Sequence, residues 1–451
     1  MDCLAWSRAP RQDPETAANP PRRLRGRDPR RAGAAREGVP DAQLPVDLPT
    51  VLRLPKSPKK VTMYLMADNV RIVWLLGAGF SRSLGGPLLA HLFRPRSRQS
   101  DLERFPDVTY PNLADELFHT RACFNAGKRD GLWEDAEEFL VFVDDAYRKD
   151  NNNGVKLRLL QELGGRMDWG YEDLLPAWRL DRLKFRLDAF KDFGRGARRS
   201  LAAECSAFLL ELDPNDERWR PYEEWVRGLQ PHKDTVICFN YDRVLETLEG
   251  RVHGALKSLL PSECPNPPSD DLNWNCVPVL KLHGSVDWRK SGPACPIVRE
   301  DAHKLLISTS ETPFIAAPGR SKQEAVNEFR PLWDLARHHL RQADVLVVLG
   351  YGFPASDAMA RTEIQMAFRG GNPKGRVKRV DFVLGPYVDR PESRRVHALL
   401  ETSTDGRQIV WYPDPPVIRN APGSQAPILY LTVHRLWAED FIFDYKLRTR
   451  I

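Results

Sequence analysis

A loop of small residues after an apolar run is the first feature of this sequence that could do chemistry. It reads Gly77-Ala78-Gly79-Phe80-Ser81 and follows a run that ends at Leu76. Glycine lets a backbone approach a ligand closely, and free N–H groups at a helix start suit a phosphate. The dinucleotide fingerprint of dehydrogenases would need glycine at position 82, where Arg82 stands, and the Gly-Lys-Ser/Thr end of a Walker A loop is absent. The loop therefore predicts a phosphate site of another class.

Three further loops present polar or small side chains after predicted buried strands. They are Asn240 and Asp242 after Thr235–Phe239, His283 after Val277–Leu282, and Gly350, Tyr351, Gly352 and Ser356 after Val345–Leu349. Each has an ordinary structural explanation, since Asn-x-Asp is common turn chemistry and a lone histidine is most often structural. A histidine at the open end of a buried strand is nevertheless placed like a general base. Because parallel strands end at one edge of a sheet, the four loops together predict a dinucleotide site.

The elements that must position these loops are short apolar strands without alternation, as expected for strands covered on both faces. They are Val70–Leu76, Thr235–Phe239, Val277–Leu282, Val345–Leu349, Val380–Leu384 and Gln408–Tyr412. Helical patterns lie between them, which predicts an α/β fold with a Rossmann-like, mainly parallel sheet. Residues 428–445 are predicted to close the chain as an edge strand and a helix.

The interval of about 88–232 shows no convincing strand and predicts a large helical insertion after the first strand. Apolar residues recur at helical spacing within 132–148 and 197–212. We expect these helices to pack over the ligand-binding edge of the sheet. Their aromatic residues follow the 3.6-residue period, which favours core positions over a platform for stacked bases.

Composition and charge exclude several classes of function. The formal net charge of +6 comes entirely from residues 1–60, which hold ten prolines, so 1–65 is predicted to be a disordered Arg/Pro-rich leader. The remainder is neutral, which argues against direct nucleic-acid binding. No apolar run is long enough to span a membrane. The seven cysteines form no C-x-x-C pair, which fits a reducing cytoplasm and argues against a bound metal.

The order of the motifs resembles the sirtuin superfamily. Gly-Ala-Gly-x-Ser, Asn-x-Asp, His-Gly and a Gly-Tyr-Gly loop follow one another over about residues 68–390, with close matches confined to these four segments. The resemblance implies that Gly77, Ala78, Gly79 and Ser81 cradle the phosphates of NAD. It also implies that Asn240 positions the nicotinamide ribose and water, that Asp242 holds the carboxamide, and that His283 is the catalytic histidine.

The departures from the sirtuin pattern narrow the expected activity. The two C-x-x-C pairs of the deacylase zinc module and the Phe-Gly-Glu strand that grips acyl-lysine peptide are absent, while residues 314–357 resemble the prokaryotic sirtuin-like NAD-hydrolase branch of antiphage defence systems. Residues 66–451 are therefore expected to form one sirtuin-like domain with a C-terminal extension from about 391. The expected activity is metal-free NAD⁺ glycohydrolysis, in which NAD⁺ is the substrate.

Two alternatives stay open from the sequence, namely an NAD-dependent protein deacylase and a non-catalytic sensor that binds NAD or ADP-ribose. An NAD⁺ hydrolase would drain a cofactor that its own cell needs, so we expect control by self-assembly or by a separate partner. The partner would be a defence-system ATPase or a nucleic-acid sensor, and the setting would be abortive infection.

Overall fold

The computed structural model describes most of the chain beyond residue 69. The described residues are 70–95, 103, 113–147, 154–165, 193–269, 275–292, 294–308, 311–318, 321–354, 357–369, 379–386, 395, 398, 408–412 and 428–449. The predicted leader, residues 1–65, lies outside them. Within this part of the chain, no helix has the length and apolar character needed to cross a membrane.

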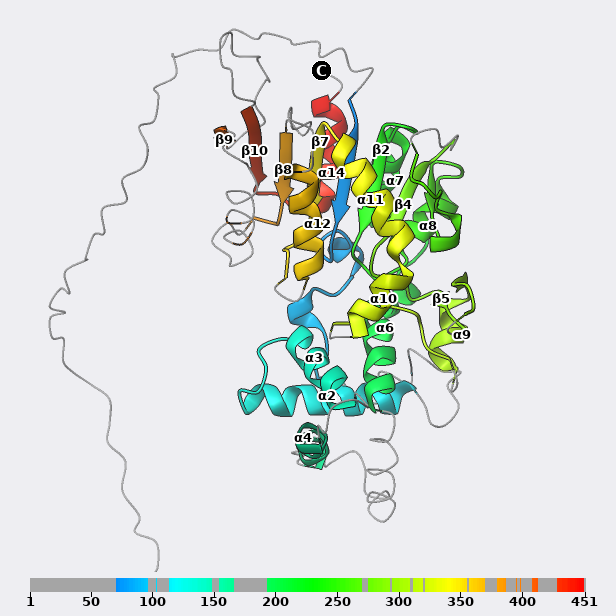
Figure 1. The fold of residues 1–451 in the computed structure, drawn as a ribbon, viewed down its shortest axis with the longest axis vertical. Coiled ribbons are helices and arrows are strands. Elements are labelled where there is room, and N and C mark those ends of the chain that lie inside the picture. The colour runs from blue at the N-terminus through cyan, green and yellow to red at the C-terminus, as the bar shows by residue number, and fades with distance from the viewer. Residues whose placement is uncertain are drawn as a thin grey trace, which may run out of the picture. The chain divides into compact units, whose positions relative to one another are not determined.

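A parallel β-sheet of eight strands forms the centre of the fold (Figure 1). Its strands are β1 (Ile72–Leu76), β2 (Asp234–Cys238), β3 (Leu256–Ser258), β4 (Val277–Lys281), β7 (Val345–Leu349), β8 (Arg379–Val383), β9 (Gln408–Tyr412) and β10 (Ile428–His434). They lie in the order β3-β4-β2-β1-β7-β8-β10-β9, and every neighbouring pair is parallel. The prediction of a Rossmann-like α/β fold is confirmed.

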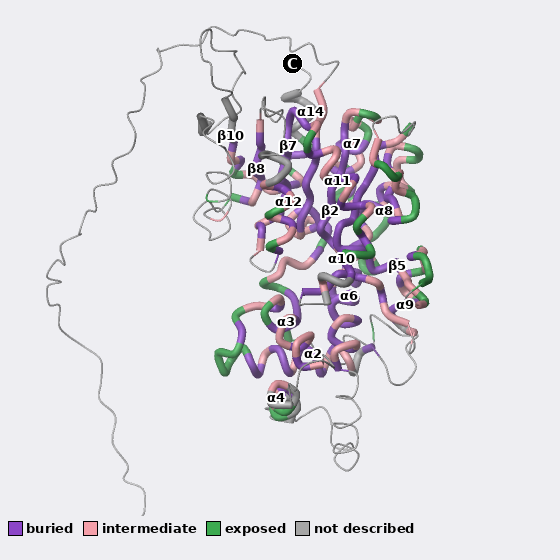
Figure 2. Tube along the Cα trace, in the orientation of Figure 1, coloured by how far each residue is buried: buried purple, intermediate pink, exposed green. Residues whose placement is uncertain are grey.

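Helices cover both faces of the sheet, which explains why its strands are apolar without alternation (Figures 1 and 2). Val73 and Leu75 of β1 pack on the side of α11 (Arg330–Gln342) and α12 (Ala358–Arg369). Trp74 and Leu76 pack on the other face, in the core with α7, α8 and α14. These three helices span Arg220–Gly228, Val244–Arg251 and Ala438–Thr449.

The described part of the interval between β1 and β2 is helical, as predicted. It contains η2 (Arg82–Leu84), η3 (Leu89–His91), α2 (Leu113–Arg129), α3 (Ala136–Tyr147), α4 (Gly154–Gly165), α6 (Phe193–Glu211), η5 (Glu217–Trp219) and α7. Helices α2, α3, α4 and α6 share a second hydrophobic core and lie beyond the carboxyl ends of the strands (Figure 1). Phe139 of α3 is buried in this core, and Phe142 and Tyr147 are partly buried against it.

The segment between β4 and β7 adds a small sheet and two helices to the fold. It holds a small antiparallel pair, β5 (Trp288–Arg289) with β6 (Val298–Arg299), followed by α9 (Ala302–Ile307) and α10 (Ser321–Glu328). A further short helix, η6 (Pro261–Glu263), follows β3. Pro331 in the first turn of α11 suits a helix start, because a proline there leaves no hydrogen bond unmade.

Two details of the sheet differ from the sequence prediction. The last strand, β10, pairs with both β8 and β9, so it is an internal strand, and β9 occupies the edge instead. The prediction of an edge strand at 428–434 was wrong because pairing order depends on contacts far apart in the chain. The second difference is β3, at the opposite edge of the sheet. The sequence did not predict this strand, because its three residues are too few to give a periodic signal.

Candidate functional site

A cavity of about 320 Å³ lies at the carboxyl edge of the sheet. Strand β1 stands between β2 and β7, and the three strands end level because Leu76 is in register with both Cys238 and Leu349. The chain crosses to opposite sides of β1 at this point, which is where open α/β sheets bind ligands. The loops after β1, β2, β4 and β7 all contribute to the lining, together with residues of α3, α6 and α10.

The glycines of the first loop pack against the loop after β7. A Cβ added to Gly79 would lie 2.6 Å from the Cα of Gly350, and one added to Gly77 would lie 2.6 Å from the Gly350 oxygen. The Gly79 N–H donates to the Gly350 carbonyl at 3.0 Å. These glycines are thus required by the contact between two loops, whereas the sequence suggested that they leave room for a ligand. Among the described residues, no backbone acceptor is found for the Ala78 N–H, and Ala78 lines the cavity.

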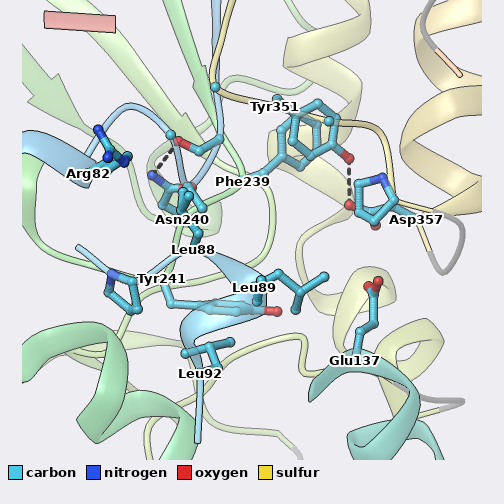
Figure 3. A pocket seen from close by; sticks show the side chains of 18 of the residues that line it. Arg82, Leu88, Leu89, Leu92, Glu137, Phe239, Asn240, Tyr241, Tyr351 and Asp357 are labelled. Atoms are coloured by element: carbon cyan, nitrogen blue, oxygen red, sulfur yellow. Dashed lines mark hydrogen bonds between the residues drawn. The ribbon is translucent and has the colours of Figure 1, made fainter. Parts of the chain in front are cut away.

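Asn240 is held at the end of β2 by two hydrogen bonds from its amide nitrogen. Nδ2 donates to the Gly77 carbonyl at 2.9 Å and to the Ser81 hydroxyl oxygen at 3.2 Å (Figure 3). Both amide protons are therefore used. The amide oxygen of this cavity-lining residue is left as the atom that can accept a hydrogen bond from a ligand or water.

Ser81 and Asp242 form the support behind Asn240. The Ser81 hydroxyl donates to Oδ2 of Asp242 at 2.7 Å, and Oδ1 of Asp242 accepts from the Val244 N–H at the start of α8. Ser81 is almost fully buried and is not one of the residues that line the cavity. Burial raises the pKa of Asp242 despite the nearby Lys281. Both residues hold Asn240 in place, and neither carboxylate oxygen of Asp242 is free in this arrangement.

His283 sits at the end of β4 beside the carboxylate of Asp357. Its Nε2 lies 3.2 Å from Oδ1 of Asp357, without an aligned hydrogen bond, and the backbone of Phe239 is a partner of the ring. Burial lowers the pKa of His283, against the raising effect of Asp357. The imidazole is therefore neutral near pH 7.

Asp357 collects partners from three elements. It contacts His283, its Oδ2 accepts from the Tyr351 hydroxyl at 2.5 Å, and its Oδ1 pairs with the ammonium of Lys322 on α10. Burial by itself would raise the pKa of this carboxyl, but His283 and Lys322 outweigh burial and hold it below the usual value. Asp357 is therefore ionised near pH 7 and links the β4 and β7 loops.

An aromatic pair lines the cavity between Asn240 and Asp357. The rings of Phe239 and Tyr351 are stacked with centroids 4.2 Å apart (Figure 3). Phe239 also meets the His283 ring edge-on at 5.0 Å. Such contacts fix side chains and exclude water from one wall of a site.

Positive side chains line the cavity at both ends. Arg82 lies by Asn240, with its guanidinium carbon 3.8 Å from the centroid of Trp437, and Lys322 lies on the Asp357 side. Arg395 also contributes to the lining. Arg82, beside the glycine loop, suits a ligand that carries phosphate groups, whereas Lys322 is already paired with Asp357.

The structure brings together nearly all the residues that the sequence singled out. Gly77, Ala78, Gly79, Asn240, Asp242, His283, Gly350, Tyr351 and Gly352 line one cavity. Ser356 lies outside the described residues. The sequence interpretation assigned no role to Arg82, Glu137, Lys322, Asp357 or Arg395. Only Asp357 had a signal, since it stands at a helix start after the Gly-Tyr-Gly loop.

Comparison with family models and with curated proteins gives no relative from which a role could be taken. No protein-family model matches the chain, and no curated protein matches it. Among the described residues, no group of three or more His, Cys, Asp or Glu side chains is arranged to hold a metal ion.

Proposed function

We propose that this chain hydrolyses NAD⁺ at the bond between nicotinamide and ribose, releasing nicotinamide and ADP-ribose. One observation carries the proposal. The Gly-Ala-Gly loop, Asn240 and His283 come from three separate strand ends and line a single cavity. The cavity volume of about 320 Å³ lies within the range of small-molecule sites.

The chemistry needs little beyond orientation and charge. Nicotinamide in NAD⁺ is already a cationic leaving group, so cleavage leaves an oxocarbenium-like ribose that water can attack. The free amide oxygen of Asn240 is suited to hold that water or a ribose hydroxyl. Neutral His283 accepts a proton from water or from a ribose hydroxyl. Arg82, which lies beside Asn240 and the glycine loop, is suited to the pyrophosphate.

The proposed role of Asp242 needs a change of partner. The resemblance to sirtuins gives this residue the nicotinamide carboxamide, but Ser81 and Val244 hold both of its oxygens here. We propose that Asp242 acts by fixing Ser81, and through it Asn240, and that any contact with nicotinamide follows release of one of these bonds.

The proposal is tested by comparing NAD⁺ turnover in the wild type with that in His283→Ala. The matched control is His253→Ala, because His253 is exposed and is not among the residues that line the cavity. We expect His283→Ala to lose turnover and the control to keep it. Nicotinamide release only in the presence of acyl-lysine peptide would support a deacylase instead, and binding of NAD⁺ without release would support a sensor.

We propose further that the chain acts in the cytoplasm as an NAD-depleting effector of antiphage defence, controlled by self-assembly or by a separate ATPase or nucleic-acid sensor. The reason is that unrestrained hydrolysis would harm its own cell. Specific turnover should rise with protein concentration or on addition of the partner. Full turnover in a monodisperse monomer at every concentration would contradict this control.

A further inference from the structure

The wall of the cavity opposite the strand ends is built by the helical insertion. This wall consists mainly of apolar side chains from the η3 segment, α3 and α6, such as Leu89, Leu140 and Leu201. Glu137 of α3 is the one carboxylate that the described insertion places in the lining. An acidic group in an otherwise apolar wall calls for a functional explanation.

Local structure fixes the position of Glu137. Oδ1 of Asp135 accepts from the backbone N–H groups of Glu137 and Glu138, at 2.9 and 3.0 Å, and so caps the start of α3. Ala136 and Phe139 bury one side of the first turn in the helical core. Figure 3 shows the consequence, with the Glu137 side chain rising from α3 and its carboxyl end pointing into the cavity on the side of Asp357.

Glu137 differs from the other two carboxylates of the cavity in its partners. Asp242 is held by Ser81 and Val244, and Asp357 is held by Tyr351 and Lys322. Among the described residues, the carboxyl of Glu137 accepts no hydrogen bond. Burial raises its pKa to about 7, with Lys322 opposing and Asp357 adding to the rise. Its oxygens are free for substrate or water, and it changes charge close to neutral pH.

The alternative proton acceptor, His283, has the Asp357 carboxylate beside its basic nitrogen. One ring nitrogen faces the Asp357 carboxylate at 3.2 Å, and the ring also bonds the backbone of Phe239. Both partners are acceptors and a neutral imidazole has a single N–H to donate, so the bond to Phe239 leaves Nε2 unprotonated beside the Asp357 carboxylate. A carboxylate without protein donors is better placed to remove a proton from water.

We propose that Glu137 is the proton acceptor for the attacking water, which makes the helical insertion part of the catalytic site. This inference rests on the proposed NAD⁺ hydrolysis. As the water oxygen bonds to C1′ of the ribose, the C1′–N bond breaks and its electron pair neutralises the nicotinamide ring. The proton of the water passes to Glu137 and then to solvent. His283 is left to act on the ribose hydroxyl.

The test is the pH profile of kcat for the full chain and for Glu137→Gln. In the wild type, kcat should fall about tenfold per pH unit below about 7, because the reaction needs the carboxylate. Glu137→Gln should lose about 10²-fold or more of kcat at pH 8 and should lose this acidic limb. The matched control is Glu138→Gln, which alters the exposed neighbour on the same helix and should behave as the wild type.

Each outcome bears on one claim. A Glu137→Gln enzyme that keeps kcat within about threefold and keeps the acidic limb would overturn the role of Glu137 while leaving NAD⁺ hydrolysis in place. A rise in KM alone would also overturn it, by showing that the residue only binds substrate. A wild type that never cleaves NAD⁺ would overturn the proposed function itself. If Glu137→Gln fails to fold, Glu137→Asp provides a second test. This variant keeps a carboxylate and should retain the acidic limb of the pH profile at reduced kcat.

Discussion

Replacement of Gly350 by alanine tests whether the two glycine loops pack on each other. Gly350 has φ of +63°, and an added Cβ would lie 2.4 Å from the Cα of Gly79 and 2.6 Å from the Phe80 nitrogen. Both neighbours are backbone atoms, which cannot rotate away as a side chain could. We therefore expect two separate costs, one from backbone conformation and one from the forced movement of the loop.

A matched control, Gly254→Ala, separates the two contributions to the loss of stability. Gly254 has φ of +75°, and nothing lies within 4 Å of its added Cβ, so Gly254→Ala carries only the conformational cost of about 1–2 kcal/mol. Gly350→Ala adds the displacement of packed backbone, about 1–3 kcal/mol by analogy with overpacked cores. The free energy of unfolding should thus fall by about 1–3 kcal/mol more for Gly350→Ala than for Gly254→Ala.

The assay is urea denaturation of both variants and the wild type, followed by tryptophan fluorescence, without NAD⁺. Equal destabilisation of the two variants would refute the packing explanation. If Gly350→Ala then also lost NAD⁺ binding, the glycine would instead be required for approach of the ligand, as the sequence alone suggested.

The remaining predictions concern single side chains of the site. His283→Ala and Asn240→Ala should each lower NAD⁺ turnover by at least about 10²-fold while remaining folded, and near-normal rates would exclude the assigned mechanism. Ser81→Ala should lower the free energy of unfolding by about 1–3 kcal/mol in urea, because it removes the buried donor to Asp242; an unchanged urea midpoint would mean that this bond contributes nothing. Because the pKa of Glu137 is raised in the folded state, the folded protein is favoured while the carboxyl is protonated, and this stability is lost as pH rises through about 7. Glu137→Gln should therefore be more stable than the wild type, with a free energy of unfolding higher by about 3 kcal/mol at pH 8 and by about 1 kcal/mol at pH 5. Thermal or urea unfolding at the two pH values measures this difference, and a difference independent of pH would contradict the prediction.

The sequence predicted most of the strands, and the loops that line the cavity, for one physical reason. Strands covered on both faces are continuously apolar, so β1, β2, β4 and β7 stand out, and parallel strands bring their carboxyl ends to one edge. Asn240 and His283 are more than forty positions apart in the chain and still line one cavity because of this geometry.

The features that the sequence missed depend on contacts between distant segments. The internal position of β10 results from its pairing with β8 and β9. Gly79 and Gly350 contact each other across the sheet edge, which no local pattern reveals. Glu137 lies in an acidic stretch that resembles a solvated helix face, and only the packing of α3 against the helical core turns it into the cavity.

The most direct test of the central claim is to incubate the purified chain with NAD⁺ alone, at low and high protein concentration, and to quantify the products by chromatography. No acylated peptide is added. We expect nicotinamide and ADP-ribose in equal amounts, with a yield per protein that is unchanged by chelators. NAD⁺ that stays intact at every protein concentration, with the protein shown to be folded, would contradict it.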